Sequence, residues 1–408
     1  MKIVEINTVR VGSTGKIMLQ IAEAARSHGH EVYTFSCARH MGQKTERFHG
    51  ATGSFFGDAL HRILAPIVGR EGIFSYFGTK RFIKKLKKID PDVIHLHNLH
   101  GYYVNLPLLF KYTKESNKKV VWTLHDCWAF TGHCPYFTFV GCEKWKDGCH
   151  HCPQPRMYPQ MYLDASKWMY KKKKQWFSDI RDMTIVTPSQ WLSDLVKESF
   201  LKDYPTKVIN NGIDLEVFKP TESDFRETHG IAENEKIILG VAFGWGVRKG
   251  LDIFIELSKR LDTDKYKIVL VGTDETVDAQ LPKNIISIHR THNQTELAQI
   301  YATADVFVNP TREDNYPTVN MEALACGTPV LTFRTGGSPE MLDEHCGMVV
   351  PCEDIDAMEQ GIIRICEEEP FLAETCRNKA KEFDKRTHFE EYVNLYEDRT
   401  HSTECTIQ

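Results

Sequence analysis

Short apolar runs alternate with longer stretches of helical periodicity along the whole chain, and they fall into two successive series. The first series opens with an apolar run at 3–6, a glycine-bearing loop, a predicted helix over 15–28 and a second apolar run at 31–37. Gly29 is expected to end the helix. Strand, helix and strand in this order form a βαβ unit. Further strands of this series are predicted at 93–97, 120–124 and 184–186.

A second series of the same kind begins near Lys236. The chain has 408 residues, which suits two domains of about 200 residues each. We place the boundary at 210–212, so that the domains cover 1–212 and 213–385 and a helical tail covers 386–408. Because strand and helix alternate in both series, we expect two doubly wound α/β domains. The predicted strands of the second series are 237–241, 268–271, 285–288, 306–308 and 330–333.

Charge and hydropathy narrow the classes of protein. The net charge of −4 argues against a general nucleic-acid binder. The chain has no N-terminal charged-then-apolar segment of the kind found in signal peptides, and no apolar run approaches the roughly 20 residues that span a bilayer. We therefore expect a cytoplasmic protein.

The most informative stretch is 310–330, which reads PTREDNYPTVNMEALACGTPV. It begins at the carboxyl end of a predicted buried strand, where open α/β sheets bind their ligands. Glu313 and Asp314 form an acidic pair there, and Pro317 lets a helix begin near Thr318. The first N–H groups of that helix have no partner within it and can receive a phosphate without a metal.

This stretch resembles the acidic signature of retaining GT-B fold glycosyltransferases, in the large family (glycosyltransferase family 4-like, group 1) that includes sucrose synthase and many bacterial capsule and lipopolysaccharide transferases. In that family two Glu residues lie eight positions apart; here the second falls on Glu322, about one turn into the predicted helix, and the first on Asp314, with Glu313 beside it. The resemblance implies that Glu322 binds the ribose hydroxyls of the donor nucleotide and that either Asp314 or Glu313 approaches the donor sugar. It also implies a donor-binding role for the neighbouring residues Asn315, Tyr316, Pro317, Thr318 and Val319.

The fold that this resemblance implies is GT-B, in which two Rossmann-like doubly wound domains face a central cleft. The tail 386–408 would then return to the first domain. In the second domain, the run VAFGWGVRKG at 241–250 places Arg248 and Lys249 between a strand and a helix, where two cations can neutralise a diphosphate leaving group. The family has an Arg five residues before the Lys; that position is Gly244 here, and Arg248 is predicted to take its place.

In the first domain, the turn 12–15 lies between the first strand and its helix. The amides of Gly12, Thr14 and Gly15 can approach the donor phosphate or the acceptor. A plain strand-to-helix turn is the alternative.

Two histidine-bearing segments follow strands of the first domain, HLHNLHGYY from His95 and TLHDCWAFTGHC from position 123. The second is similar to the family segment in which a His followed by an acid contacts the donor sugar. We therefore choose His125 and Asp126 for the reactive centre, with His97 and His100 as weaker candidates because a His near a strand end is often structural.

The function implied by the resemblance is metal-independent transfer of a sugar from a nucleotide-diphosphate sugar, with retention at the anomeric carbon, to a saccharide acceptor in cell-surface polysaccharide synthesis. No cofactor is expected for catalysis, and His125 would position the donor rather than take a proton. Two alternatives stay open: a nucleotide-sugar epimerase or hydrolase on the same scaffold, and an inactive protein that binds carbohydrate or nucleotide. The donor base, UDP or GDP, the transferred sugar, the linkage and the oligomeric state leave no trace in the sequence.

Basic residues concentrate in the first domain at 80–88 and at 167–174, the latter among aromatic residues. Together they suit an anionic membrane surface, which predicts a lipid-linked acceptor and peripheral attachment at the inner face of the cytoplasmic membrane. Solvated helix faces are the alternative.

An aromatic, Gly- and Pro-punctuated insert at 127–152 carries clustered cysteines. Four thiolates at such spacings can bind a structural Zn²⁺ tetrahedrally, and in a reducing compartment zinc is favoured over disulfides. Free thiols packed against aromatic side chains are the alternative. The four candidate ligands are Cys134, Cys142, Cys149 and Cys152.

Overall fold

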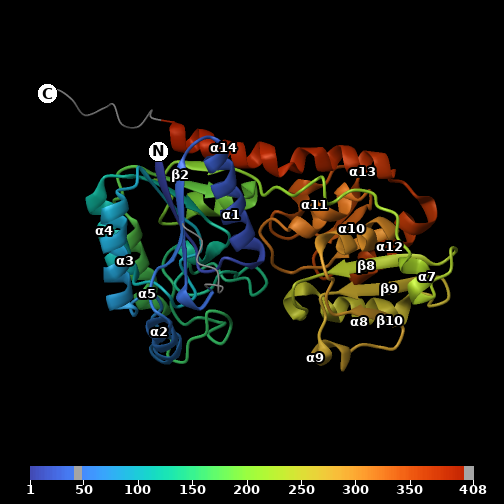
Figure 1. Cartoon of the computed structure of the whole chain (residues 1–408). Helices are drawn as coiled ribbons and strands as arrows, with labels where there is room; N and C mark the ends of the chain where they lie inside the picture. Colours follow the sequence, from blue (N-terminus) through green and yellow to red (C-terminus); the bar gives the residue numbers. More distant parts are fainter. Residues whose placement is uncertain (41–47, 399–408) are drawn as a thin grey trace. The chain divides into compact units, whose positions relative to one another are not determined.

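The computed structural model describes residues 1–40 and 48–398 and divides into two compact units (Figure 1). The first unit comprises Met1–Asn210 together with the chain from His388 onward, and the second comprises Asn211–Thr387. Each unit contains one parallel β-sheet with helices, as the alternating pattern predicts. Within the described residues, no helix is both long enough and apolar enough to cross a membrane.

The sheet of the first unit has the strand order β3-β2-β1-β4-β5-β6-β7. The order reverses between β1 and β4, so the loops after these strands lie at the topological switch point where α/β proteins bind ligands. Its strands are β1 (Lys2–Ile6), β2 (Glu31–Ser36), β3 (His49–Ala51), β4 (Val93–Leu96), β5 (Lys119–Thr123), β6 (Met183–Thr187) and β7 (Thr206–Val208). Its helices are α1 (Gly12–Ser27), α2 (Phe55–Val68), α3 (Tyr76–Ile89), α4 (Leu106–Ser116), α5 (Ser166–Phe177) and α6 (Gln190–Glu198), with the 3₁₀ helices η1 (Ala38–His40) and η2 (Cys127–Phe130).

The second unit repeats this plan with the strand order β10-β9-β8-β11-β12-β13, reversing between β8 and β11. Its strands are β8 (Lys236–Val241), β9 (Tyr266–Val271), β10 (Ile285–Ile288), β11 (Val306–Asn309), β12 (Val330–Phe333) and β13 (Gly347–Val350). Its helices are α7 (Phe225–His229), α8 (Leu251–Arg260), α9 (Glu275–Asp278), α10 (Gln294–Thr303), α11 (Thr318–Ala325), α12 (Ile355–Glu368) and α13 (Ala373–Ala380), with the 3₁₀ helices η3 (Val247–Lys249), η4 (Ser338–Met341) and η5 (Lys381–Phe383). The chain passes from the second unit back to the first inside α14 (Lys385–Glu397).

Both sheets are buried on both faces, which explains why their strands read as continuous apolar runs. In the first unit, Ile94 and Leu96 belong to the core formed with α3, α4 and α5, whereas Val93 belongs to the core formed with α1 and α14. Side chains alternate between the two faces of a strand, so the two cores are separated by the sheet.

The structure differs from the sequence prediction in some details. The first helix begins at Gly12 rather than at position 15; Gly12 has a left-handed backbone (φ 74°), and its N-cap, Val11, makes no side-chain hydrogen bond. The short strands β3, β7 and β13 were not foreseen, because runs of three or four residues carry little periodicity. Of the predicted tail, 399–408 lies outside the described residues.

Candidate functional site

Two loops meet at the switch point of the second unit. One follows β8 and contains η3, and the other follows β11 and leads into α11, whose N-cap is Pro317. Lys249 forms a hydrogen-bonded ion pair with Asp314, and the guanidinium of Arg248 donates to the carbonyl of Glu313 at 2.9 Å. The predicted cations and the predicted acidic pair are thus brought together.

Asp314 is the member of the acidic pair whose carboxylate makes this contact. Burial alone would raise the pKa of its carboxyl group, but Lys249 and then Arg248 outweigh burial and hold that pKa below its ordinary value. Its Oδ1 also accepts from the backbone N–H of Asn315 at 2.9 Å. Glu313 is buried, and its backbone carbonyl accepts from Arg248. Of the two alternatives for the residue at the donor sugar, Asp314 is the one whose carboxylate contacts the predicted phosphate-binding lysine.

The N-terminus of α11 has no side-chain cap, so its first amides keep the phosphate-binding capacity that the sequence predicts. Thr318 and Val319 at this end are partly exposed, whereas Asn315, Tyr316 and Pro317 are buried. Glu322 lies one turn further along α11, and its Oε2 accepts from the hydroxyl of Tyr301 at 3.2 Å. The helix therefore presents amides at its start and a carboxylate one turn inside.

Arg312 is a residue that sequence reasoning missed. It is 4% exposed and makes bidentate hydrogen bonds to Asp252 (2.7 and 2.8 Å) and a second pair with Glu353. It also bonds to the carbonyl of Val247, so one guanidinium joins the two loops and α8. Arg312 therefore fixes where Lys249 and Asp314 meet.

Two glycines allow the backbones of these loops to approach each other. Gly250 has φ 76°, and a Cβ there would lie 2.5 Å from the carbonyl oxygen of Pro310. Gly336 has φ 52°, and a Cβ there would lie 1.7 Å from the carbonyl oxygen of Asp314. The close contact and the positive φ at each position both require glycine. The donor motif alone does not reveal this requirement.

In the first unit, the turn 12–15 opens α1 after β1. Gly15 is required for packing, since a Cβ there would lie 2.4 Å from the carbonyl carbon of Arg10. Thr14 accepts from the side-chain amide of Asn7 at 3.4 Å. The N-cap of α1, Val11, supplies no side-chain hydrogen bond, so the amides of Gly12, Thr14 and Gly15 lie at an uncapped helix start, and their role in anion binding stays a prediction.

His125 and Asp126 lie directly beyond β5 and are nearly buried. Asp126 contacts His100 at 3.0 Å, and it also accepts from the backbone N–H of Trp128 at 2.9 Å. Burial would raise the pKa of Asp126 and lower that of His100, but their mutual attraction outweighs it: the pKa of Asp126 is lowered and that of His100 is raised. His100, the weaker candidate, is therefore the ion-pair partner of the predicted acid.

His125 has a different partner. Its Nε2 lies 3.1 Å from Nδ1 of His97. Burial lowers the pKa of His125 to about 4, so the imidazole is neutral at pH 7. A neutral imidazole with so low a pKa is a poor proton acceptor, which agrees with a positioning role.

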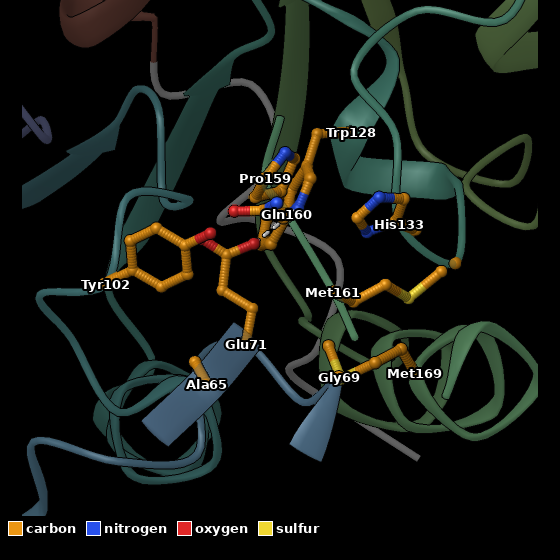
Figure 2. A pocket seen from close by; sticks show the side chains of 11 residues that line it. Ala65, Gly69, Glu71, Tyr102, Trp128, His133, Pro159, Gln160, Met161 and Met169 are labelled. Atoms are coloured by element: carbon orange, nitrogen blue, oxygen red, sulfur yellow. Dashed lines mark hydrogen bonds between the residues drawn. The ribbon is translucent and has the colours of Figure 1, made fainter. Parts of the chain in front are cut away.

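Glu71, a second residue that sequence reasoning missed, supports this region from the segment between α2 and α3. Its carboxyl oxygens accept from the N–H of Gly101 (2.6 Å) and from the indole N–H of Trp128 (3.0 Å). Figure 2 shows Glu71, Tyr102 and Trp128 at a small cavity of about 10 Å³, which has room for roughly one water molecule. This cavity is too small for a sugar.

The predicted basic surface at 167–174 does not include Lys173, because this side chain is buried. It is fully buried, its ammonium donates to the carbonyls of Trp128 (2.7 Å) and Thr131 (3.1 Å), and it lies 3.4 Å from the centre of a Trp128 ring. Burial lowers its pKa to about 7. The run of four lysines at 171–174 predicts an exposed basic face, but the helical period of α5 directs its third member, Lys173, into the core.

The cysteine insert is a compact region with little regular structure. Between η2 and α5 no helix or strand occurs, yet Phe137 and Trp145 are buried there. The four predicted zinc ligands lie near enough to affect one another's charge, and burial raises the pKa of Cys134 to about 12 and of Cys149 to about 11. Among the described residues, the ligand atoms of these four cysteines do not all lie within 4.8 Å of one another. A zinc site there stays a prediction.

Comparison with known proteins identifies the family of the chain. The model of the family "Glycosyltransferase Family 4" matches residues 14–217, and that of "Glycosyl transferases group 1" matches residues 235–368. The chain belongs to this family of glycosyltransferases.

Individual relatives extend the match over most of the chain. The putative colanic acid biosynthesis glycosyl transferase WcaC of Escherichia coli K12 is 28% identical over 319 residues, covering 75% of this chain and 76% of the relative. Sucrose-phosphate synthase of Thermosynechococcus elongatus has a similar structure (TM-score 0.72, 18% identity, 97% of this chain and 98% of that one). So has Anabaena HepE, solved in complex with UDP (TM-score 0.65, 15% identity, 97% and 99%). The fold is GT-B, as the resemblance implied.

Proposed function

We propose that this glycosyltransferase moves a sugar from a nucleotide-diphosphate sugar to a saccharide acceptor, with retention and without a metal, in the synthesis of a cell-surface polysaccharide. The observation that carries the proposal is the contact of Lys249 with Asp314 beside the uncapped start of α11, with Glu322 one turn inside. The colanic acid relative supports the polysaccharide pathway, and the UDP complex of HepE supports a nucleotide donor.

The proposed donor site, formed by the loops after β8 and β11, carries positive charges that suit a diphosphate. Arg248 and Lys249 contribute two positive charges at this contact, and Asp314 offsets one of them before the donor binds. The first amides of α11 add the positive end of the helix dipole. As the diphosphate leaves, it gains negative charge. Its contacts with these groups are therefore stronger in the transition state than in the intact donor, which lowers the barrier.

The available groups support the proposal of transfer without a metal. The neutral His125, with its low pKa, is suited to hold a sugar hydroxyl and not to remove the acceptor proton, which the leaving phosphate oxygen would take. Among the described residues, the side chains grouped tightly enough to bind a metal are Glu5, His95 and His97, which lie on or directly after the strands of the first unit. The donor loops of the second unit supply two cations instead.

A lipid-linked acceptor is supported by an exposed apolar stripe on α2. Phe56, Leu60, Ile63 and Ile67 are 86%, 55%, 61% and 48% exposed, and their spacing puts them on one face of the helix. The start of α3 contacts α2, since the Ser75 hydroxyl lies 3.4 Å from the carbonyl of Gly57.

The helix α3 adds positive charge beside the stripe. All its basic side chains are exposed, and they are Lys80, Arg81, Lys84, Lys85, Lys87 and Lys88. An apolar stripe next to a basic helix fits the inner, anionic face of the cytoplasmic membrane. We therefore propose peripheral attachment there through α2 and α3.

The test is donor binding followed by product analysis. Purified protein is mixed with UDP, GDP and their sugars while thermal unfolding is followed, with Glu322→Ala as the matched variant. Stabilisation by one nucleotide that the variant loses identifies the donor base. NMR of the product then shows whether the anomeric configuration is retained. Donor turnover without an acceptor would instead support an epimerase or hydrolase, and no stabilisation by any nucleotide would contradict the proposal.

A further inference from the structure

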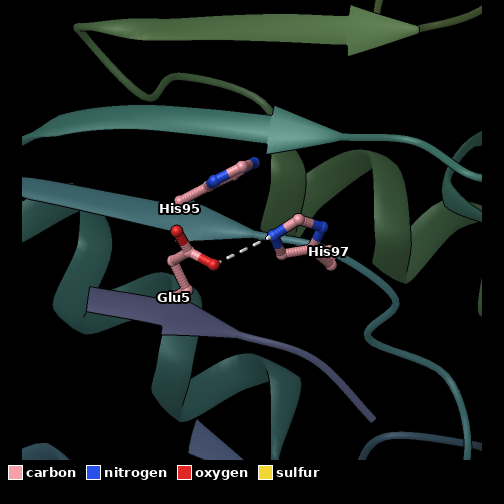
Figure 3. A group of neighbouring side chains, drawn as sticks. All are labelled: Glu5, His95 and His97. Carbon is pink, nitrogen blue, oxygen red and sulfur yellow. Dashed lines mark ion pairs between the residues drawn. The ribbon is translucent and has the colours of Figure 1, made fainter. Parts of the chain in front are cut away.

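Some polar side chains on the strands of the first sheet, or directly after them, lie too deep to meet a ligand. Glu5, His95 and His97 form such a group (Figure 3), and at most 1% of each residue is exposed. His100 is different, because one of its ring nitrogens is hydrogen-bonded to Tyr158, a residue that is half exposed. Tyr158 lies between the cysteine insert and α5. It therefore connects the buried polar groups at this edge of the sheet with solvent.

The hydroxyl of Tyr158 is held by a short chain of polar groups. It lies 2.9 Å from Nδ1 of His100, and Nε2 of His100 lies 3.0 Å from Oδ2 of Asp126. Oδ1 of Asp126 accepts from the backbone N–H of Trp128 at 2.9 Å. A hydroxyl can both donate and accept, so its bond to the imidazole forms whichever of the two groups supplies the proton. The hydroxyl is thus fixed in place for either charge of His100.

The loop that carries His100 is itself fixed by two further contacts. The hydroxyl of Thr8 donates to the carbonyl of His100, and the N–H of Gly101 donates to Oε1 of Glu71 at 2.6 Å. Thr8 follows β1 and His100 follows β4, the two neighbouring strands at which the strand order reverses. Tyr158 is therefore anchored at the switch point of the first unit, where α/β sheets bind ligands.

The segment that carries Tyr158 is also held from behind. The N–H of Tyr162 donates to the carbonyl of Pro66 in α2 at 2.7 Å. Residues 159–161 line the small cavity of Figure 2, which has room for about one water molecule. The space behind the segment is thus closed to a sugar, and the free surface of Tyr158 is its exposed side.

Tyr158 presents an apolar ring surface at this place. The residue is 51% exposed, although its hydroxyl contacts a histidine that is only 7% exposed. The polar end of the side chain therefore points inward and leaves part of the ring accessible. The face of an aromatic ring carries partial negative charge, which suits the C–H groups on one face of a pyranose ring. Because the side chain is already anchored, little freedom is lost when a sugar binds.

We propose that Tyr158 binds a sugar ring of the substrate by stacking, and that His100 and Asp126 are positioning residues which hold it for this contact. The proposal rests on the function proposed above only for the source of that sugar, which is either the acceptor or the sugar moiety of the donor. Binding of the sugar ring itself concerns the first unit of the free protein.

The test separates the ring of Tyr158 from its anchor. Tyr158→Leu removes the aromatic face, whereas Tyr158→Phe keeps the ring but loses the bond to His100. Tyr162→Leu is the matched control. Tyr162 is 54% exposed in the same segment, but its ring lies 4.7 Å from the guanidinium carbon of Arg156.

Two assays distinguish the sources of the sugar. Saturation-transfer NMR titrations with the methyl glycosides of glucose, galactose, mannose and N-acetylglucosamine measure binding of a sugar ring without a nucleotide. Isothermal titration calorimetry compares UDP-glucose with UDP and GDP-mannose with GDP, so that the difference in affinity is the contribution of the donor sugar.

The wild-type protein should bind at least one glycoside, or bind a nucleotide sugar more tightly than its nucleoside diphosphate. Tyr158→Leu should weaken that sugar binding about 3- to 10-fold, the range expected for loss of an aromatic contact, and Tyr158→Phe should weaken it less. Tyr162→Leu should match the wild type. An effect on the glycosides identifies the acceptor sugar, and an effect on the calorimetric difference identifies the donor sugar.

Three results would overturn the proposal: no binding of a sugar ring in either assay, unchanged binding in Tyr158→Leu, or a loss in Tyr158→Phe as large as in Tyr158→Leu. The last result would show that the hydroxyl acts on the structure and that the ring does not bind sugar. A wild-type protein that binds glycosides but neither UDP nor GDP contradicts the proposed function and leaves the role of Tyr158 supported.

Discussion

Lys249 and Asp314 form an ion pair between the loops that follow β8 and β11, neighbouring strands on either side of the point where the strand order reverses. A donor diphosphate would meet this pair already assembled. The lysine then has two anionic neighbours, and its contact with the phosphate strengthens as the leaving group gains charge. The pair therefore bears on rate more than on ground-state affinity.

We expect Lys249→Met to lower kcat by about 100- to 1000-fold, as for loss of other groups that stabilise a developing charge, with a small change in KM. Steady-state kinetics with the donor identified above measures this. Lys259→Met is the matched control, since Lys259 is exposed on α8 and pairs with Glu256. An unchanged kcat would remove Lys249 from the mechanism.

Replacing Glu322 should act on affinity instead. Glu322→Ala removes a hydrogen-bonding carboxylate from the proposed ribose site, and we expect the nucleotide to bind about 10- to 100-fold more weakly. Isothermal titration calorimetry with the free nucleoside diphosphate measures the effect without turnover. Tyr301→Phe keeps the carboxylate but removes its 3.2 Å hydrogen bond, so it should have a smaller effect. Equal affinity in wild type and Glu322→Ala would refute the assignment.

The pH dependence of stability should report the ion pair between Asp126 and His100. The pKa of His100 is raised in the folded state, so its contribution is present below its unfolded value and is lost as pH rises through the folded pKa. The pKa of Asp126 is lowered, so its contribution is lost as pH falls through the folded pKa. The pH ranges in which the protonated His100 and the ionised Asp126 stabilise the folded state overlap in mildly acidic solution.

We therefore expect His100→Gln to lower the free energy of unfolding most near pH 5 to 6, by about 3 kcal/mol, and by less at pH 9. Urea denaturation of both proteins across this range measures the difference. The exposed pair of His289 with Asp278 supplies a control, since His289→Gln should cost little at either pH. A difference that grows with rising pH would contradict the ion pair.

Membrane attachment through α2 and α3 predicts binding to anionic vesicles. The double substitution of Phe56 and Leu60 by Ser should reduce co-sedimentation with vesicles that contain about a third anionic phospholipid, because it removes apolar area from the interface. Phe139→Ser is the control, as Phe139 is also exposed but lies in the cysteine insert. Equal binding of all three proteins, or no binding by the wild type, would rule out this surface.

The zinc site proposed for the cysteine insert can be tested by measuring the zinc content of the protein. If Cys134, Cys142, Cys149 and Cys152 bind Zn²⁺, protein purified without chelator should contain about one zinc per chain, and Cys149→Ser should lose it. Removal of the metal should lower the melting temperature, because the insert has no helix or strand beyond the short η2. Cys366→Ser, at a buried thiol of the second unit, should keep the zinc. A metal-free protein with four reactive thiols would establish the alternative.

Most strands and the start of α11 could be predicted because both are local signals, whereas the short strands β3, β7 and β13 could not. Continuous apolar runs marked the buried strands, and Pro317 with the following polar residues marked the start of α11. Contacts between distant parts of the chain were out of reach: Arg312 bonds to Asp252 and Glu353, which are 60 and 41 positions away. The position of Lys173 in the core was also missed, because a run of four lysines hides which one the helix turns inward.

Gly336 has no Cβ, and this leaves room for the backbone of Asp314 in the acidic pair. The carbonyl oxygen of Asp314 occupies the space where any other residue at 336 would carry its Cβ. A single added methyl group, itself uncharged, would thus displace the residue whose carboxylate meets Lys249. Position 336 should tolerate no substitution, and a change there would resemble a catalytic defect although the residue has no side chain with which to take part in catalysis.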